Sequence, residues 1–130
     1  MQKILFMDKY PLYSLTLPKS EIRYENVGEI VAYFKAKISE YPIAKFIAVF
    51  DHYTHTKSIG GEMMEGLKDA QNIIFCFGPK IPSTHIVAVR PRSIAVCELE
   101  ACFVIEFLEA PNEAMHALMV DWTKALLQTH

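Results

Sequence analysis

An apolar run that ends abruptly in two polar residues is the feature that most constrains the fold of this chain. Residues 43–50 are almost entirely apolar, Asp51-His52 follow directly, and His55 comes shortly after. A short apolar run bounded in this way is typical of a strand, and a nearly continuous apolar character is typical of a strand covered on both faces. We therefore predict a strand covered on both faces that places Asp51 and His52 at the rim of a sheet.

A regular apolar stripe predicts a helix immediately before this strand, at residues 25–41. Asn26 is a residue type suited to the N-cap, and Glu29 in the first turn comes close to completing a capping box. Pro42 would stop the helix. The residues of the stripe recur at helical spacing and are Val27, Ile30, Val31, Phe34 and Ile38.

The rest of the chain alternates between short apolar segments and turns. We expect strands at residues 12–17, 72–77, 86–89 and 102–108. Residues 93–99 favour a strand by propensity, with a short helix as the alternative. Residues 52–59 are polar and are interpreted as a loop or fraying strand. Residues 62–68 could form one or two helical turns, although Gly66 weakens that interpretation.

A second long helix is expected to begin at Pro111, in its first turn. Its apolar stripe consists of Met115, Leu118, Met119, Trp122, Ala125 and Leu126. Such stripes are usually core, although aromatic residues and methionine are also enriched at protein interfaces. The pattern predicts a single α+β domain over residues 1–130, with one mainly antiparallel mixed sheet of about five strands and two long helices packed on it.

Composition excludes several classes of protein. The 130 residues are 52% apolar and 22% charged, with a net charge of −2, so electrostatic binding of a nucleic-acid backbone is not expected. The N-terminal apolar segment is too short for a signal peptide, and no run has the length of a membrane span. We therefore expect a cytoplasmic protein, with no nucleic-acid or membrane partner. An odd number of cysteines, Cys76, Cys97 and Cys102, predicts buried free thiols.

Three of the predicted strands together resemble a known family. One strand ends in Asp51-His52, a later one closes in Phe77-Gly78-Pro79-Lys80, and residues 102–109 end in acidic positions. The combination resembles, at a distance, the domain of unknown function 302 family (DUF302) or a sister family of the same fold. In that family a strand ends in an Asp-His pair and a later strand ends in a Phe-Gly-Asn-Pro-Lys-like turn, whereas the turn in this chain lacks the Asn between Gly78 and Pro79. The resemblance implies a compact α+β domain, often self-associating, with no settled activity.

The candidate ligand-binding residues are the polar groups at the predicted strand ends: Asp51, His52, His55, Lys80 and His85. Histidine is the commonest transition-metal ligand, and a carboxylate often orients its second nitrogen. His52 and His55 are accordingly candidate metal ligands, with Asp51 behind them. The alternative is that Asp51 caps a turn and hydrogen-bonds its own backbone, while His52 packs against the sheet.

Three further features have both a functional and a structural interpretation. Cys76 and Cys97 could join a metal cluster, since thiolate and imidazole suit zinc, copper or iron, or could simply pack. Arg90-Pro91-Arg92 could bind an anion or a partner's carboxylate, or form a solvated turn. Gly78-Pro79-Lys80 lacks the spacing of a phosphate loop and is interpreted as a turn.

No catalytic signature such as a Gly-x-Ser-x-Gly elbow occurs. We therefore predict a non-catalytic binding or self-associating module for a small apolar or anionic ligand or a protein partner, and expect a homodimer. The alternative is a metal- or haem-binding protein that uses His52 and His55. A third hypothesis, with less support, is an acid–base enzyme built on Asp51 and His52. The sequence does not identify a cofactor.

Overall fold

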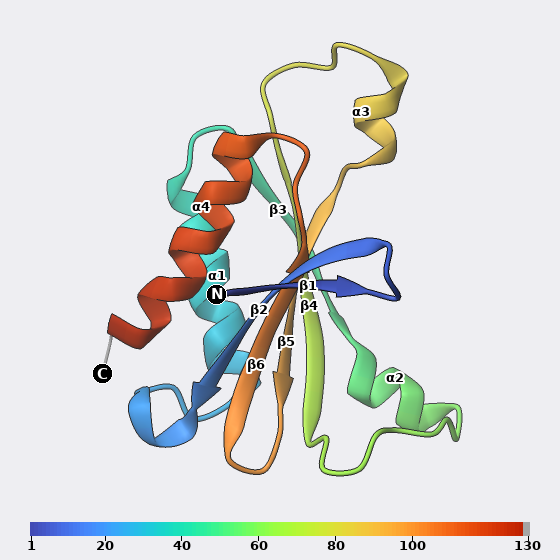
Figure 1. Ribbon diagram of the computed structural model, residues 1–130, viewed down its shortest axis with the longest axis vertical. Coiled ribbons are helices and arrows are strands. Elements are labelled where there is room, and N and C mark those ends of the chain that lie inside the picture. The colour runs from blue at the N-terminus through green and yellow to red at the C-terminus, as the bar shows by residue number, and fades with distance from the viewer. Residues whose placement is uncertain (129–130) are drawn as a thin grey trace.

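In a computed structural model, residues 1–128 are described, and they build one antiparallel sheet with helices packed on it (Figure 1). The strand order is β1-β2-β6-β5-β4-β3. The strands are β1 (Gln2–Phe6), β2 (Tyr10–Pro18), β3 (Ala44–Asp51), β4 (Asp69–Phe77), β5 (Arg92–Glu98) and β6 (Cys102–Leu108). The α+β class and the single sheet are as predicted, but the sheet has six strands, and the paired strands are antiparallel throughout.

Two long helices, α1 (Val27–Glu40) and α4 (Glu113–Lys124), pack on the same side of the sheet (Figure 1). Two shorter helices, α2 (His52–Ser58) and α3 (Thr84–Ala88), follow β3 and β4. Single 3-10 turns occur at Lys19–Glu21 and Ala125–Gln128. Among residues 1–128, no helix combines the length and the hydropathy that crossing a membrane requires.

The core lies between the sheet and these two helices. All five residues of the predicted α1 stripe are buried, as are Phe75 on β4 and Phe103 on β6. Trp122 and Met119 of α4 are 7% and 0% exposed, so these side chains belong to the core and not to a dimer surface. The Tyr33 hydroxyl of α1 donates a 2.6 Å hydrogen bond to the Trp122 carbonyl and so ties the two helices together. Burial, followed by the nearby Tyr24 and Glu40, raises the pKa of Tyr33 to about 12.

The start of α1 follows the predicted capping chemistry with one shift. The Asn26 side chain accepts a 2.8 Å hydrogen bond from the Glu29 amide, which makes Asn26 the N-cap. The Glu29 carboxylate reaches the amide of Glu25 at 3.5 Å, one residue before the position of a standard capping box. The helix ends at Glu40, before Pro42, as expected.

Strand β3 corrects the opening prediction. It is an edge strand, not one covered on both faces, and Ile47, Val49 and Phe50 are 49%, 39% and 40% exposed. The pairing with β4 shifts register between Phe46 and Ala48, which is a bulge of the kind that edge strands carry. An apolar run reports hydrophobicity but not whether a neighbouring strand or helix is present, so its continuity was misleading.

Several local predictions were also wrong. Residues 52–59 form α2 instead of a loop, and residues 86–89 lie largely in α3 instead of a strand, although β-branched side chains favoured the strand. Residues 62–68 contain no helix, and Gly66 has a φ of +86°. The strand β1 was not expected. Helix α4 begins after Asn112, so Pro111 precedes the helix and is not in its first turn.

Candidate functional site

The predicted site residues fall at opposite ends of β3. Asp51, His52 and His55 lie at its C-terminal end, where α2 begins, whereas Lys80 lies beyond the end of β4 that pairs with the start of β3. Eight strand residues separate the two ends, which corresponds to roughly 25 Å. His85 is an exposed residue of α3. The structure therefore does not bring the predicted residues together into one site.

Asp51 is fully used as the N-cap of α2. One carboxylate oxygen, Oδ1, accepts a 2.9 Å hydrogen bond from the Thr54 amide, and Oδ2 accepts one of 2.9 Å from the Thr54 hydroxyl. An acidic side chain at this position satisfies amide groups that the first turn leaves free and interacts favourably with the helix dipole. Asp51 thus has the capping role that was considered as the alternative to a ligand role.

The two histidines of α2 are exposed and contact the ring of Phe50. The ring centroids of His52 and His55 lie 4.6 Å and 5.5 Å from that of Phe50. Within residues 1–128 no group of three or more His, Cys, Asp and Glu side chains is close enough to hold a metal ion. Beside α2 there is a hollow of about 220 Å³, bordered by His52, Met63 and Leu67. The predicted metal site gains no third ligand from this geometry and stays a prediction.

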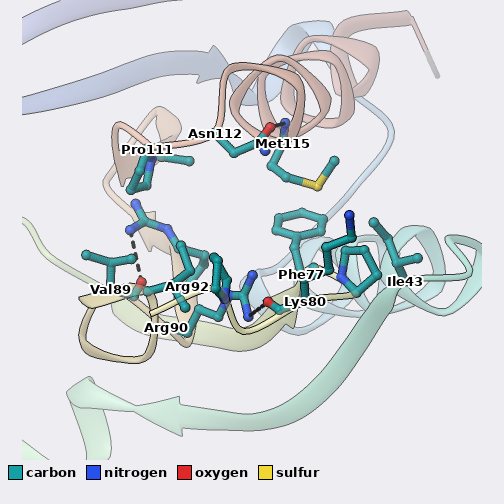
Figure 2. A pocket seen from close by; sticks show the side chains of 14 residues that line it. Ile43, Phe77, Lys80, Val89, Arg90, Arg92, Pro111, Asn112 and Met115 are labelled. Carbon is teal, nitrogen blue, oxygen red and sulfur yellow. Dashed lines mark hydrogen bonds between the residues drawn. The ribbon is translucent and has the colours of Figure 1, made fainter. Parts of the chain in front are cut away.

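A larger cavity, of about 390 Å³, lies at the other end of the molecule. It lies where the end of β4, the segment around α3, the start of β5 and the start of α4 meet (Figure 2). Of the predicted site residues, Lys80 lines it. The remaining lining residues are Ile43, Phe77, Gly78, Pro79, Pro82, Ile86, Val89, Arg90, Arg92, Ala110, Pro111, Asn112 and Met115.

The walls of the cavity are mostly apolar and come from rigid parts of the fold. Phe77 is the last residue of β4 and stacks on Trp122, with ring centroids 5.7 Å apart. Met115 projects from the first turns of α4 on the opposite side (Figure 2). Three prolines in the lining, Pro79, Pro82 and Pro111, restrict the backbone of the connecting segments. An apolar concavity with a few polar groups is the usual form of a small-molecule site.

Two arginines supply the positive charge of this cavity. The Arg90 Nη1 donates a 2.9 Å hydrogen bond to the Lys80 carbonyl. The Arg92 Nη2 donates to the carbonyls of Leu108 and Glu109, at 2.7 Å and 3.1 Å, which joins the start of β5 to the end of β6. The Arg92 Nε is buried and has no hydrogen-bond partner within the described chain.

Within the described part of the chain, neither arginine is paired with a carboxylate. The salt bridges within residues 1–128 all use lysines, and they join Lys3 to Glu109, Lys19 to Glu98 and Lys68 to Glu100. Burial lowers the pKa of Arg92, but a guanidinium stays charged at neutral pH because its ordinary pKa is so high. A half-buried cation without an acidic partner is costly, and an anion entering the cavity would relieve that cost.

The start of α4 adds to the positive potential. Asn112 lines the cavity and caps the helix, with its side-chain oxygen accepting from the amides of Ala114 and Met115 at 3.0 Å and 3.1 Å. Helix α4 has 12 residues, and its dipole directs partial positive charge toward its N-terminal end. The helix end and the two guanidinium groups therefore act with the same sign on whatever enters the cavity.

Gly78 lies against the guanidinium of Arg90. It has a φ of +112°, a conformation that residues with a Cβ rarely adopt. A Cβ at this position would overlap Nη2 and Cζ of Arg90. The sequence identified Gly78-Pro79-Lys80 as a turn that closes a strand, and the structure shows that the absent side chain also makes room for a guanidinium.

The chain also matches a known protein family. The model of a family of unknown function, DUF6858, matches residues 1–128. The chain belongs to DUF6858. The resemblance to DUF302 was wrong, because the matching family is a different one and no link between the two is shown. No curated protein matches the chain.

The two motifs behind the DUF302 resemblance have separate structural roles in this DUF6858 chain. Asp51-His52 begins helix α2, and Gly78-Pro79-Lys80 borders the cavity at the far end of the sheet. Each motif ends a strand through its own local turn or cap, so the two motifs can occur in one chain without forming a common site. The family is one of unknown function, so membership of it assigns no activity to the chain.

His116 is a further residue of this DUF6858 chain that sequence reasoning missed. Its ring packs edge-on against Tyr13, with centroids 4.2 Å apart, and its Nδ1 accepts a 3.3 Å hydrogen bond from the amide of Ala110, a lining residue. Its Nε2 is buried without a hydrogen-bond partner in the described chain. Burial is the largest influence and lowers the pKa of His116; Glu109 opposes it, and Arg92 and Lys3 add to it.

The depressed pKa of His116 gives an expected pH dependence. In the unfolded chain this histidine takes up a proton as the pH falls through about 6.5, whereas in the folded chain it does so only at lower pH. The unfolded state therefore binds more protons in that window. The contribution of His116 to stability is full above pH 6.5 and is lost as the pH falls toward the pKa of His116 in the folded chain.

We expect His116→Gln, which keeps an acceptor for the Ala110 amide, to flatten this dependence. Urea unfolding at a series of pH values between about 7 and 5 gives the free energy of unfolding as a function of pH for the wild type and for the variant. The wild-type curve should fall more steeply than that of the variant. Parallel curves would contradict the assignment of this pH dependence to His116.

Proposed function

We propose that this DUF6858 member is a non-catalytic binding module for a small ligand with an apolar body and an anionic head. The observation that carries the proposal is the cavity of about 390 Å³, whose charged lining residues, Lys80, Arg90 and Arg92, are all cations. Cavities of this size accommodate small organic molecules. The net charge of the whole chain is −2, so the positive lining is a local feature that contrasts with the rest of the molecule.

The distribution of groups supports an amphipathic ligand. Arg90 and Arg92 lie toward one side of the cavity, and Phe77, Met115 and Ile43 lie toward the other (Figure 2). A guanidinium binds a planar carboxylate or a phosphate through two parallel hydrogen bonds, and within residues 1–128 the Arg90 guanidinium uses only its Nη1 in a hydrogen bond. The apolar side would take up the body of the ligand through burial of its surface.

The lining also supports binding over catalysis. Among residues 1–128 the lining contains no Asp, Glu, His, Ser or Cys, so the cavity offers no carboxylate or imidazole base, and Lys80 is its one side chain of a nucleophilic type. The hydrogen bonds from Arg90 and Arg92 to backbone carbonyls hold the guanidinium groups in place. Preorganised cations of this kind reduce the entropy cost of binding an anion.

The test compares a naphthalene carboxylate with its neutral carboxamide by calorimetric titration. We expect the carboxylate to bind more tightly, and Arg90→Met to weaken its binding about tenfold or more, which is about 1.4 kcal/mol. The affinity for the carboxamide should be unchanged in this variant. Lys57→Met, which removes an exposed positive charge on α2, is the control with the same change in net charge.

Two outcomes would refute the proposal. One is equal affinity for the carboxylate and the carboxamide in the wild-type protein. The other is an equal effect of Arg90→Met and Lys57→Met, because a general electrostatic attraction depends on net charge and not on the position of the cation. Such an attraction would also be strongly screened by salt, whereas contacts inside the cavity would be screened less.

A further inference from the structure

The face of the sheet that points away from α1 and α4 is mostly uncovered. On β6, Phe103, Ile105 and Phe107 of the covered face are at most 3% exposed, whereas Val104 between them is half-buried and Leu108 is 47% exposed. Helix α2 and the segment after it cover one end, near Ala70. We define the open face as the side chains of the six strands on this side, among them Phe6, Leu12, Ala48, Ile74, Ala95 and Val104.

The hairpin of β1 and β2 extends this apolar surface beyond the core. Every residue of β1 is exposed, including Leu5 at 56% and Phe6 at 53%. The hairpin turn places Met7 and Asp8 at φ of 55° and 58°, where glycine or asparagine is usual. Met7 is 68% exposed. A long apolar side chain therefore lies at the tip of the hairpin, on a backbone conformation that residues with a Cβ rarely adopt.

Charge and edge structure both favour face-to-face contact with an identical chain. The charged side chains of the open face are Lys45 on β3 and Glu106 on β6, so two copies of this face meet without net repulsion. Contact between sheet edges is disfavoured, because β3 carries a bulge between Phe46 and Ala48 and β1 has only five residues. The faces are therefore the better surfaces for association.

We propose that a second copy of this chain covers the open face in a two-fold symmetric dimer. Six strands about 4.8 Å apart, with rises of about 3.3 Å per residue, give the face a projected area of roughly 550 Å². Side-chain relief makes the accessible surface larger, which brings it close to the approximately 800 Å² per partner of a stable interface. A two-fold interface uses the same patch on both copies, and the open face, with one Lys and one Glu, can be self-complementary.

The native mass of the full chain tests this proposal. At about 100 μM, where a dimer of micromolar affinity is nearly saturated, light scattering should give twice the 14.8 kDa chain mass. Ala95→Lys places a charge in the middle of the open face, where Glu106 on the neighbouring strand can pair with it, and is expected to give 14.8 kDa. Ala36→Lys, on the exposed side of α1, is the matched control and should leave the dimer intact.

The three cysteines provide a second measurement, which can be made on the wild-type protein. Cys76, Cys97 and Cys102 are free, half-buried and on the open face, so they are not the buried core thiols that the sequence predicted. Their reaction with a maleimide should slow as the protein concentration rises, and in Ala95→Lys it should not depend on concentration.

A wild-type mass of 14.8 kDa at all concentrations, with thiol reactivity independent of concentration, would overturn the proposal. A dimer that persists in Ala95→Lys would overturn the assignment of the interface to the open face. If Ala95→Lys does not fold, Leu108→Lys replaces it, since that side chain is 47% exposed and tolerates a change more readily. Neither measurement involves a ligand, so the result is independent of the function proposed for the cavity.

Discussion

Replacing Gly78 with alanine is expected to abolish most of the binding of a naphthalene carboxylate and to lower the free energy of unfolding by about 2–3 kcal/mol. Two causes act together. The backbone has a φ of +112°, which is strained for any residue with a Cβ, and the new methyl group would overlap the guanidinium of Arg90. Arg90 must then leave its place beside the cavity and give up its hydrogen bond to the Lys80 carbonyl.

A matched glycine separates the two causes. Gly66 also has a positive φ, of +86°, but nothing lies within 4 Å of a Cβ built on it. Gly66→Ala should therefore lose stability through backbone strain alone and keep its affinity for the carboxylate. In an Arg90→Ala background, Gly78→Ala should cost less stability than in the wild type, because the overlap is gone. Full affinity in Gly78→Ala would show that the position of Arg90 does not matter for binding.

Replacing Phe75 with alanine is expected to have the largest effect on stability, about 3–5 kcal/mol. Phe75 is fully buried near the C-terminal end of β4 and contacts the rings of Phe77 and Trp122, with centroids 5.0 Å and 6.2 Å away. Its removal costs the transfer of a large apolar side chain and leaves a cavity between the sheet and the helices. A loss of this size is a large fraction of the stability of an ordinary domain.

Urea unfolding monitored by circular dichroism measures this loss from the shift of the midpoint. Ile59→Ala is the control, because Ile59 is a large apolar residue that is 68% exposed and its truncation should change stability by less than about 0.5 kcal/mol. A loss below about 1 kcal/mol for Phe75→Ala would mean that the core is not organised around β4.

The parts of the fold that the sequence predicted well are those with a regular local signal. The apolar stripe of α1 and the Asn26 cap both depend on residues close together in the sequence, and both are present in the structure. Strand β4 and strand β6 were found from their apolar runs. The parts predicted wrongly depend on neighbours distant in sequence: β3 reads as a buried strand, but its position at the sheet edge exposes Ile47.

The short helices show how local signals can compete. Asp51 and Thr54 together make the cap of α2, but the polar residues after β3 equally suggested a loop. In α3, Ile86 and Val87 have strand propensity, and the segment nevertheless forms a helix of five residues. Propensity is a weak indicator over so few residues, because the context of the fold can override it.

The cavity could be predicted only in part. Lys80 was identified as a candidate and the Arg90–Arg92 pair was identified as a possible anion site, but they were considered separately. Phe77 and Met115, from opposite ends of the second half of the chain, have no linear motif that connects them. Asp51 and His52 were predicted as site residues because they are polar and follow an apolar strand. In the structure both carboxylate oxygens of Asp51 accept hydrogen bonds from Thr54 in the cap of α2.

The most direct test of the central claim, that the cavity beside Arg90 and Arg92 is the binding site, is an amide chemical-shift map of the protein titrated with the naphthalene carboxylate. We expect the largest changes at Gly78, Arg90, Ala110 and Asn112, all of which line the cavity. Largest changes on α2, at residues 52–55, or no changes with saturating ligand, would contradict it.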